Sequence, residues 1–165
     1  MVEIHVVRRG FRFDGGGEVA AKSYVEALSS MFDVSVICEG ATTETQSCAN
    51  NIVVIKRGLG RTAKYKNFVR SVERLATERG YFLHSHEFIP GAGVIRLGDG
   101  LHSSWVRKNN IDLNSIFDKF HRFKIEVECA TLKHPSLQFA IVNSSMVARD
   151  LVSTHNFDPA RIVLI

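Results

Sequence analysis

Short apolar runs alternate with longer stretches of helical spacing along the whole chain. Runs typical of β-strands occupy residues 2–7, 32–38, 51–55, 81–84, 93–97, 138–142 and 161–165. Helical spacing occupies residues 18–31, 61–79 and 114–133, and a last helix is capped by Ser144 or Ser145 and continues to about His155. This alternation predicts a mostly parallel sheet with helices on both faces. We therefore expect an α/β fold, with residues 1–165 forming one three-layer α/β/α, Rossmann-like domain.

The composition is that of a single globular domain, with 165 residues, 45% hydrophobic and 23% charged. The three cysteines, Cys38, Cys48 and Cys129, are widely spaced and form no C-x-x-C pair, which argues against a disulfide framework or a structural zinc site. The apolar run around Cys38 predicts that this residue is buried. The chain begins without a signal-peptide pattern and has no apolar stretch of spanning length, so we expect a cytoplasmic protein. The net charge of +4 permits an anionic partner.

A glycine-rich loop, Gly15, Gly16, Gly17 and Glu18, joins the first predicted strand to the first helix. Consecutive glycines allow a ligand to approach the backbone closely, because no Cβ atoms intervene. The helix N-terminus that follows offers free N–H groups and a partial positive charge, which suit a phosphate. The loop therefore predicts an anion site, and the alternative is a flexible surface turn.

The same loop also fits a dinucleotide fingerprint, with Gly15, Gly17 and Ala20 at the required spacing and Glu39 after the second strand. An NAD-dependent oxidoreductase is therefore an alternative. The fingerprint requires a tight turn directly after the strand, whereas residues 9–14 separate the strand from Gly15. This insertion places the oxidoreductase second.

His84, His86 and Glu87 stand at the carboxyl end of a predicted central strand, where open α/β sheets bind ligands. Residues two apart on a strand face the same side, so both imidazoles are predicted to address one crevice. They suit hydrogen bonding to hydroxyls or phosphate, or acid–base chemistry. A third metal ligand with convincing spacing is missing, so no metal site is predicted. The alternative is that these polar residues simply end a strand.

Asp99 lies between two glycines at the carboxyl end of the next predicted strand. The glycines leave space for a ligand, and the carboxylate is suited to accept a hydrogen bond from a sugar hydroxyl or to serve as a base. The alternative is a turn aspartate that caps the segment beginning at Leu101.

The predicted helix over residues 61–79 is strongly basic. Residues 56–79 contain eight basic and two acidic side chains. The basic positions Lys64, Lys66, Arg70 and Arg74 suit contact with an anionic membrane surface, since each basic residue contributes about 1 kcal/mol there. The apolar stripe at helical spacing is explained as well by packing on the sheet. A membrane- or partner-binding module is thus the non-enzymatic alternative. Nucleic acid is not expected, because no interleaved aromatic platform is present.

Five short motifs follow one another along the chain. They are the glycine loop at residues 15–18, the stretch 84–99 with Pro90, Gly91 and Asp99, the segment 128–131, the segment 142–145 and the segment 158–162. In this order they resemble glycosyltransferase family 4, a family of GT-B enzymes, and within it the lipopolysaccharide-core glucosyltransferases.

The resemblance implies that this chain is the acceptor-side, N-terminal half of a GT-B fold. It implies a further C-terminal domain that binds the nucleotide sugar and lies outside these residues. Such enzymes are retaining, transfer a sugar from a donor such as a UDP-sugar to a glycan or lipid-linked acceptor, need no metal or other cofactor, and dock on the inner membrane face. Gly15–Gly17 would then lie near the donor diphosphate, Asp99 near the reacting centre, and His84, His86 and Glu87 on the acceptor side.

Overall fold

The computed structural model describes residues 3–10, 16–40, 49, 51–56, 58–113 and 118–165, and within them a seven-stranded parallel sheet is the centre of the fold. Its strands are β1 (Glu3–Val7), β2 (Asp33–Cys38), β3 (Asn51–Val54), β4 (Phe82–Ser85), β5 (Val94–Leu97), β6 (Phe139–Val142) and β7 (Ile162–Leu164). The helices are α1 (Gly16–Ser29), α3 (Arg61–Arg79), α4 (His102–Lys108), α5 (Lys119–Leu132) and α6 (Ser145–His155), with a short 3₁₀ turn, η2 (Pro159–Arg161), before β7.

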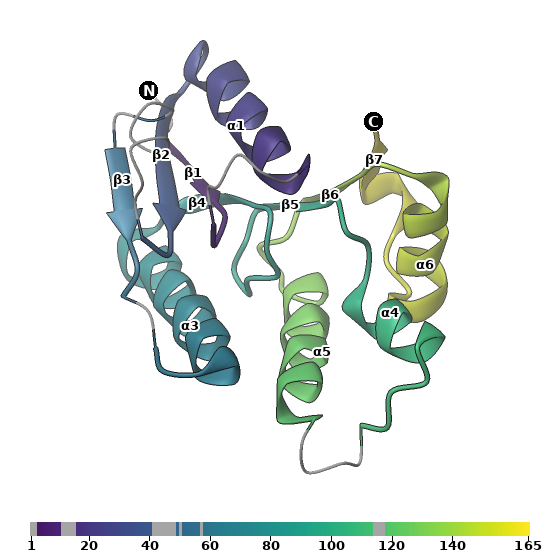
Figure 1. Ribbon diagram of the computed structural model, residues 1–165. Coiled ribbons are helices and arrows are strands. Elements are labelled where there is room, and N and C mark those ends of the chain that lie inside the picture. Colours follow the sequence, from purple (N-terminus) through teal and green to yellow (C-terminus); the bar gives the residue numbers. More distant parts are fainter. Residues whose placement is uncertain (1–2, 11–15, 41–48, 50, 57, 114–117) are drawn as a thin grey trace.

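Helices cover both faces of the sheet, so the predicted α/β/α layering is confirmed. Figure 1 shows α1 on one face and α3, α5 and α6 on the other. Alternate residues of each strand supply the two cores, because successive side chains point to opposite faces. Val6 of β1 packs with Val25 of α1, whereas Val7 packs with Phe68 of α3. The central strands β1, β2 and β4 are buried on both faces, which explains why they are mostly apolar in sequence.

The strand order is β3-β2-β1-β4-β5-β6-β7. Successive strands are added on one side of β1 up to β3 and on the other side from β4 onward, so the topological switch point lies between β1 and β4. In open α/β sheets ligands bind beyond the carboxyl ends of the strands at this switch point. Parallel pairing aligns Val7 of β1 with Ser85 of β4, and Ser85 with Ile95 of β5. The residues that follow β1, β4 and β5 therefore meet at one edge of the sheet.

Most predicted elements agree with the structure to within one or two residues at their ends. The basic helix begins and ends as predicted, and Gly80 terminates it in the left-handed region (φ 65°). Ser144 caps α6 by accepting a hydrogen bond from the N–H of Val147, and Cys38 is fully buried. Residues 114–117 of the predicted long helix lie outside the described residues.

Helix α4 was not predicted from the sequence. It has seven residues, and its N-cap residue is Leu101, whose side chain accepts no hydrogen bond from the backbone N–H groups of the helix. The segment therefore carries no local start signal for a helix. The first N–H groups of α4 are satisfied instead by Glu128 of α5, which is distant in the sequence.

Candidate functional site

A cleft of about 390 Å³ opens at the carboxyl edge of the sheet, beside the switch point. Of the residues predicted for the site, Gly17, His86, Glu87 and Asp99 all line this cleft. They come from α1 and from the segments that follow β4 and β5. Gly17 and Asp99, which are more than eighty residues apart in the sequence, thus line one cleft, whereas Gly16 and His84 are not among its lining residues.

Gly17 is in close contact with the guanidinium of Arg8. A Cβ atom on Gly17 would lie 2.6 Å from Nη2 of Arg8, which is closer than real side chains approach. A Cβ atom on Gly16 would meet nothing within 4 Å. The absence of a side chain at Gly17 therefore allows a cation to lie against the N-terminus of α1, whose N–H groups favour anions. Gly15 lies outside the described residues, and Glu18 belongs to the first turn of α1.

His84 and His86 lie side by side, with ring centroids 5.4 Å apart. Both pack against Tyr24 of α1, which confirms that they face the same side. Only His86 lines the cleft, and His84 lies behind it. Burial, together with the positive charge of Arg96, lowers the pKa of His84 to about 4. Burial and the neighbouring His84, Arg96 and Arg8 lower the pKa of His86 to about 3.

Both imidazoles are therefore neutral at pH 7, and the positive charges of Arg96 and Arg8 lie near them. Among the described residues, neither ring nitrogen of His86 has a hydrogen-bond partner. A bound anion would supply an acceptor and would favour protonation of the ring. The arrangement suits hydrogen bonding to an anionic ligand better than general base chemistry at neutral pH.

Glu87 is connected to the segment that follows β1. Its Oε1 accepts a hydrogen bond from the backbone N–H of Arg9 at 3.3 Å and lies 3.9 Å from Nη1 of Arg8. Burial raises the pKa of Glu87, and the charges of Arg8, Arg9 and Lys124 offset part of this effect. The carboxylate thus holds the segment after β1 in place and lies near the guanidinium of Arg8, which lines the cleft.

Asp99 is exposed within the cleft and lies on a loop whose backbone is well anchored. The side-chain amide of Asn143 donates to the carbonyl of Gly98 at 3.0 Å. Gly100 adopts a positive φ of 74°, which a side chain disfavours. A Cβ atom on Gly98 would lie 2.6 Å from Nη1 of Arg96, so this glycine also allows a close guanidinium. The loop presents the carboxylate of Asp99 to a ligand in the cleft.

Sequence reasoning missed the cations of the cleft. Within the described part of the chain, Arg8, Arg61, Arg96 and Lys124 line it, against the carboxylates of Glu87 and Asp99. Each of these four cations comes from a different part of the chain, so no local sequence pattern predicts that they meet in one cleft. Arg96 alone carried a signal, because it is charged in an otherwise apolar strand. Its side chain extends toward Tyr24, with Cζ 5.6 Å from the ring centroid.

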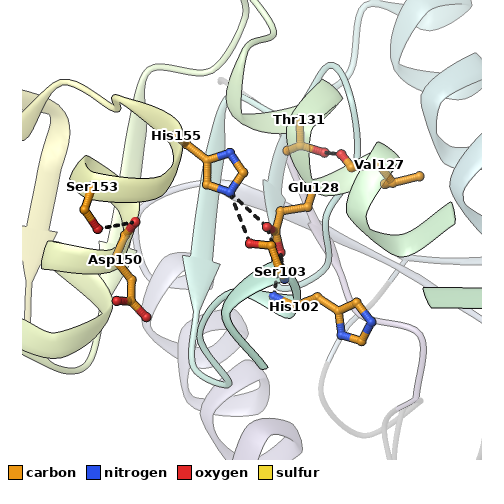
Figure 2. Close-up of polar contacts among 8 residues, drawn as sticks. All are labelled: His102, Ser103, Val127, Glu128, Thr131, Asp150, Ser153 and His155. Carbon is orange, nitrogen blue, oxygen red and sulfur yellow. Dashed lines mark hydrogen bonds and ion pairs between the residues drawn. The ribbon is translucent and has the colours of Figure 1, made fainter. Parts of the chain in front are cut away.

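A buried carboxylate supports the loop region that carries Asp99. Figure 2 shows Glu128 of α5 between His155 of α6 and the start of α4, where it accepts hydrogen bonds from the N–H groups of His102 and Ser103. Glu128 is fully buried. Burial alone would raise the pKa of Glu128, but the hydrogen bonds from His155, Ser103 and His102 outweigh it and lower this pKa. The segment 128–131 therefore has a structural explanation.

The basic helix α3 packs its apolar stripe, including Tyr65, Phe68 and Val72, against the sheet. Arg70 and Arg74 are exposed, whereas Lys64 and Lys66 are partly covered. The ammonium of Lys66 lies 5.2 Å from the ring centroid of Phe123. In the described ranges, no three potential metal ligands are grouped together.

The fold is an α/β domain of the Rossmann-like type, and it matches one half of a GT-B fold. No family model matches the chain, and no curated protein matches it by sequence. Among solved structures, it is similar to WaaG, a glycosyltransferase involved in lipopolysaccharide biosynthesis, with a TM-score of 0.79 and 13% sequence identity. The match covers 98% of this chain and 44% of WaaG, so the chain spans less than half the length of that protein. The predicted resemblance is therefore confirmed at the level of the fold.

Proposed function

We propose that this chain is the N-terminal, acceptor-side half of a retaining glycosyltransferase that transfers a sugar from a nucleotide-sugar donor to a glycan or lipid-linked acceptor. A C-terminal domain would complete the donor site. The observation that carries the proposal is that Gly17 and Asp99 line one cleft at the switch point of the sheet. The fold likeness to WaaG supports the same class of reaction.

The cleft provides the electrostatic features that glycosyl transfer needs. Departure of a nucleoside diphosphate concentrates negative charge on the leaving group, and preorganised cations and helix N-termini stabilise that charge. Arg8 lies against Gly17 at the N-terminus of α1, and Arg96 lines the same cleft, so both would contribute to this stabilisation. Asp99 would accept a hydrogen bond from a sugar hydroxyl near the reacting centre. His86 and Glu87 would line the acceptor side, with His84 behind them.

The oxidoreductase alternative is not favoured by the geometry. Residues 8–15 separate the end of β1 from the start of α1, whereas a dinucleotide fingerprint needs a tight turn there. Glu39, the residue that would bind a ribose, is buried, and its Oε2 lies 3.3 Å from Nη2 of Arg9. Its carboxylate is therefore engaged within the protein.

Contact with an anionic membrane would bring the enzyme to a lipid-linked acceptor. The exposed cations of α3 would supply it through Coulomb attraction alone, because the apolar stripe of that helix faces the sheet. Such an enzyme would act at the inner face of the membrane from the cytoplasm. None of the helices within the described ranges combines the length and apolar character needed to cross a bilayer.

An amide-detected NMR titration tests the proposal, because it registers the weak binding expected of half a donor site. UDP-glucose should shift the amide signals of Gly16, Gly17 and Asp99, and NADH at the same concentration should not. Stronger shifts at Gly17 and Glu39 with NADH would favour an oxidoreductase and overturn the proposal. Turnover by these 165 residues alone would contradict the need for a second domain.

A further inference from the structure

Three nearly parallel aromatic rings stand on one wall of the cleft. His102 and Trp105 belong to α4, His121 belongs to α5, and all three line the cleft. Nε2 of His102 lies 2.9 Å from Nδ1 of His121, and the two ring planes differ by only 10°. This hydrogen bond joins the imidazoles edge to edge into one nearly flat surface. Trp105 is inclined by 15° to His102 and by 24° to His121.

Trp105 is unusually open for a residue of its size, with 47% of its surface exposed. An indole costs free energy when its apolar surface stays in water. The hydrogen bond between His102 and His121 and the buried Glu128 beneath α4 hold the ring surface in place. The rings are thus ordered by the fold, yet one of them remains uncovered at the cleft.

Two cations, Arg61 and Lys124, flank the ring surface, and Lys124 also interacts with the charges of Glu87 and Asp99. The guanidinium of Arg61 lies 3.9 Å above the ring centroid of Phe120, and Nζ of Lys124 lies 5.8 Å from the same centroid. Neither makes an ion pair with any residue that the structure describes. Burial, together with the charges of Lys124, His121 and Arg61, lowers the pKa of His102 to about 4. This end of the cleft therefore combines two cationic side chains with a His102 imidazole that is neutral at pH 7.

We propose that these five residues form a subsite for a pyranose ring that carries an anionic substituent. The apolar face of the sugar would lie against the rings of Trp105, His102 and His121, and Arg61 and Lys124 would bind the phosphate or carboxylate. We name this group the ring-and-cation subsite. Its assignment to the acceptor sugar rests on the proposed function.

The chemistry of the pieces favours an anionic sugar. The C–H groups on one face of a pyranose carry partial positive charge and pack well on the negative face of an aromatic ring. A guanidinium and an ammonium together recognise a phosphate or a carboxylate. Asp99 lines the same cleft and is an acceptor for a hydroxyl hydrogen. A nucleobase has no alcohol hydroxyl to donate to this carboxylate, whereas a pyranose has several.

The chain carries its own reporter, because Trp105 is its single tryptophan. Fluorescence titrations would use glucose 6-phosphate, glucuronate, glucose, inorganic phosphate and UMP. We expect saturable quenching by glucose 6-phosphate or glucuronate, and the stronger of the two identifies the anionic group. Glucose and inorganic phosphate should each bind about tenfold or more weakly, because each lacks half of the recognition. Equal responses to inorganic phosphate or UMP, or no saturable response to either anionic sugar, would overturn the proposal.

Two variants test the cations, and a third serves as their control. Arg61→Gln and Lys124→Gln should each weaken binding of the anionic sugar about tenfold, since each removes a charged hydrogen-bond donor. Lys133→Gln changes an exposed lysine at the other end of α5 and should leave binding unchanged. Circular dichroism confirms that each variant is folded. Unchanged affinity in both folded cleft variants would contradict the assignment.

The outcome is separable from that of the proposed function. UDP-glucose is detected at the amides of Gly16 and Gly17, whereas the subsite is detected at Trp105. Nucleotide-sugar shifts without a Trp105 response would overturn the subsite alone. A Trp105 response to an anionic sugar without nucleotide-sugar shifts would support the subsite and contradict the donor site.

Discussion

Oε1 of Glu128 lies 2.9 Å from Nε2 of His155, so a fully buried carboxylate connects α5 with α6. The same carboxylate accepts the N–H groups of His102 and Ser103 and thereby caps α4 (Figure 2). Three consecutive helices are therefore joined through one carboxylate. The capped residues, His102 and Ser103, closely follow the loop that carries Asp99.

Removing the charge of Glu128 should therefore destabilise the domain. Glu128→Gln keeps the size of the side chain but turns an amide toward N–H donors, and we expect a loss of about 3 kcal/mol in the free energy of unfolding. Urea unfolding measures this loss. Glu126→Gln, an exposed position on the same helix, is the matched control and should change stability by less than about 0.5 kcal/mol. Equal stability of the two variants would refute the structural role.

The lowered pKa of Glu128 also predicts an acid dependence. A carboxyl group whose pKa is lower in the folded protein stabilises it above the pKa of the unfolded chain, and this contribution disappears as the pH falls through the folded value. The stability difference between the wild type and Glu128→Gln should accordingly be largest near neutral pH and should shrink below about pH 4, the ordinary range of glutamate. A constant difference down to acid pH would show that charge is not involved.

His84 and His86 should make the domain sensitive to mild acid. Their pKa values in the fold are about 4 and about 3, whereas an unfolded histidine titrates near 6.5. The unfolded chain binds more protons between these values, so stability falls as the pH drops from 6.5 toward 4, by up to about 1.4 kcal/mol per pH unit for each residue. Unfolding of His86→Gln and of the wild type across this range should show a flatter slope for the variant. Imidazole NMR signals of His84 and His86 that titrate near 6.5 would disprove the prediction.

Gly17→Ala should separate stability from ligand binding. The new Cβ would meet the end of Arg8, a flexible side chain, which can move away. Alanine also favours a helix over glycine by about 1 kcal/mol, so the melting temperature should be maintained or raised. Displacement of Arg8 should nevertheless weaken UDP-glucose binding about tenfold.

Gly16→Ala is the comparison for this variant, since its Cβ would meet nothing within 4 Å. It should affect stability similarly but should leave Arg8 in place and retain more of the binding. NMR titration with UDP-glucose measures both variants. Equal losses in the two would mean that the position of Arg8 is not the cause.

Charge reversal on α3 tests membrane contact. Changing Lys64, Lys66 and Arg70 to Glu should reduce binding to anionic vesicles at least about 100-fold, because each basic residue contributes about 1 kcal/mol. Co-sedimentation with phosphatidylserine vesicles measures this loss. The control reverses three lysines outside α3 that are exposed, Lys108, Lys119 and Lys133. Equal losses in both triple variants would indicate a nonspecific effect of net charge.

The fold was predictable because local signals agreed with one another. Apolar runs marked the strands, Ser144 marked the start of α6, and Gly80 marked the end of α3. The parallel arrangement follows from alternation of strands and helices. Helix α4 escaped prediction because Glu128, which caps it, is supplied by another helix. Local sequence carries no record of such a contact.

The candidate site was only partly predictable. Gly17, His86, Glu87 and Asp99 could be proposed because parallel strands bring their carboxyl ends to one edge, so position along each strand already implies proximity. His84 lies behind His86, since burial of the strand leaves only its last residues at the cleft. Arg8 and Lys124 could not be recognised, because each is an ordinary charged residue until the chain folds, and Arg96 stood out only as a charge within an apolar strand.

The sequence by itself determined the strand and helix pattern, the edge of the sheet at which chemistry is placed and the glycines that leave room there. These features depend on periodicity and backbone freedom, which are local properties. Tertiary structure alone decided that guanidinium groups lie against Gly17 and Gly98, that Glu128 caps a helix from another element, and that Trp105 joins two imidazoles on the cleft wall. Such contacts form only when elements that are separate along the chain pack together. Their interaction energies depend on distances between side chains in space, which spacing in the sequence does not give.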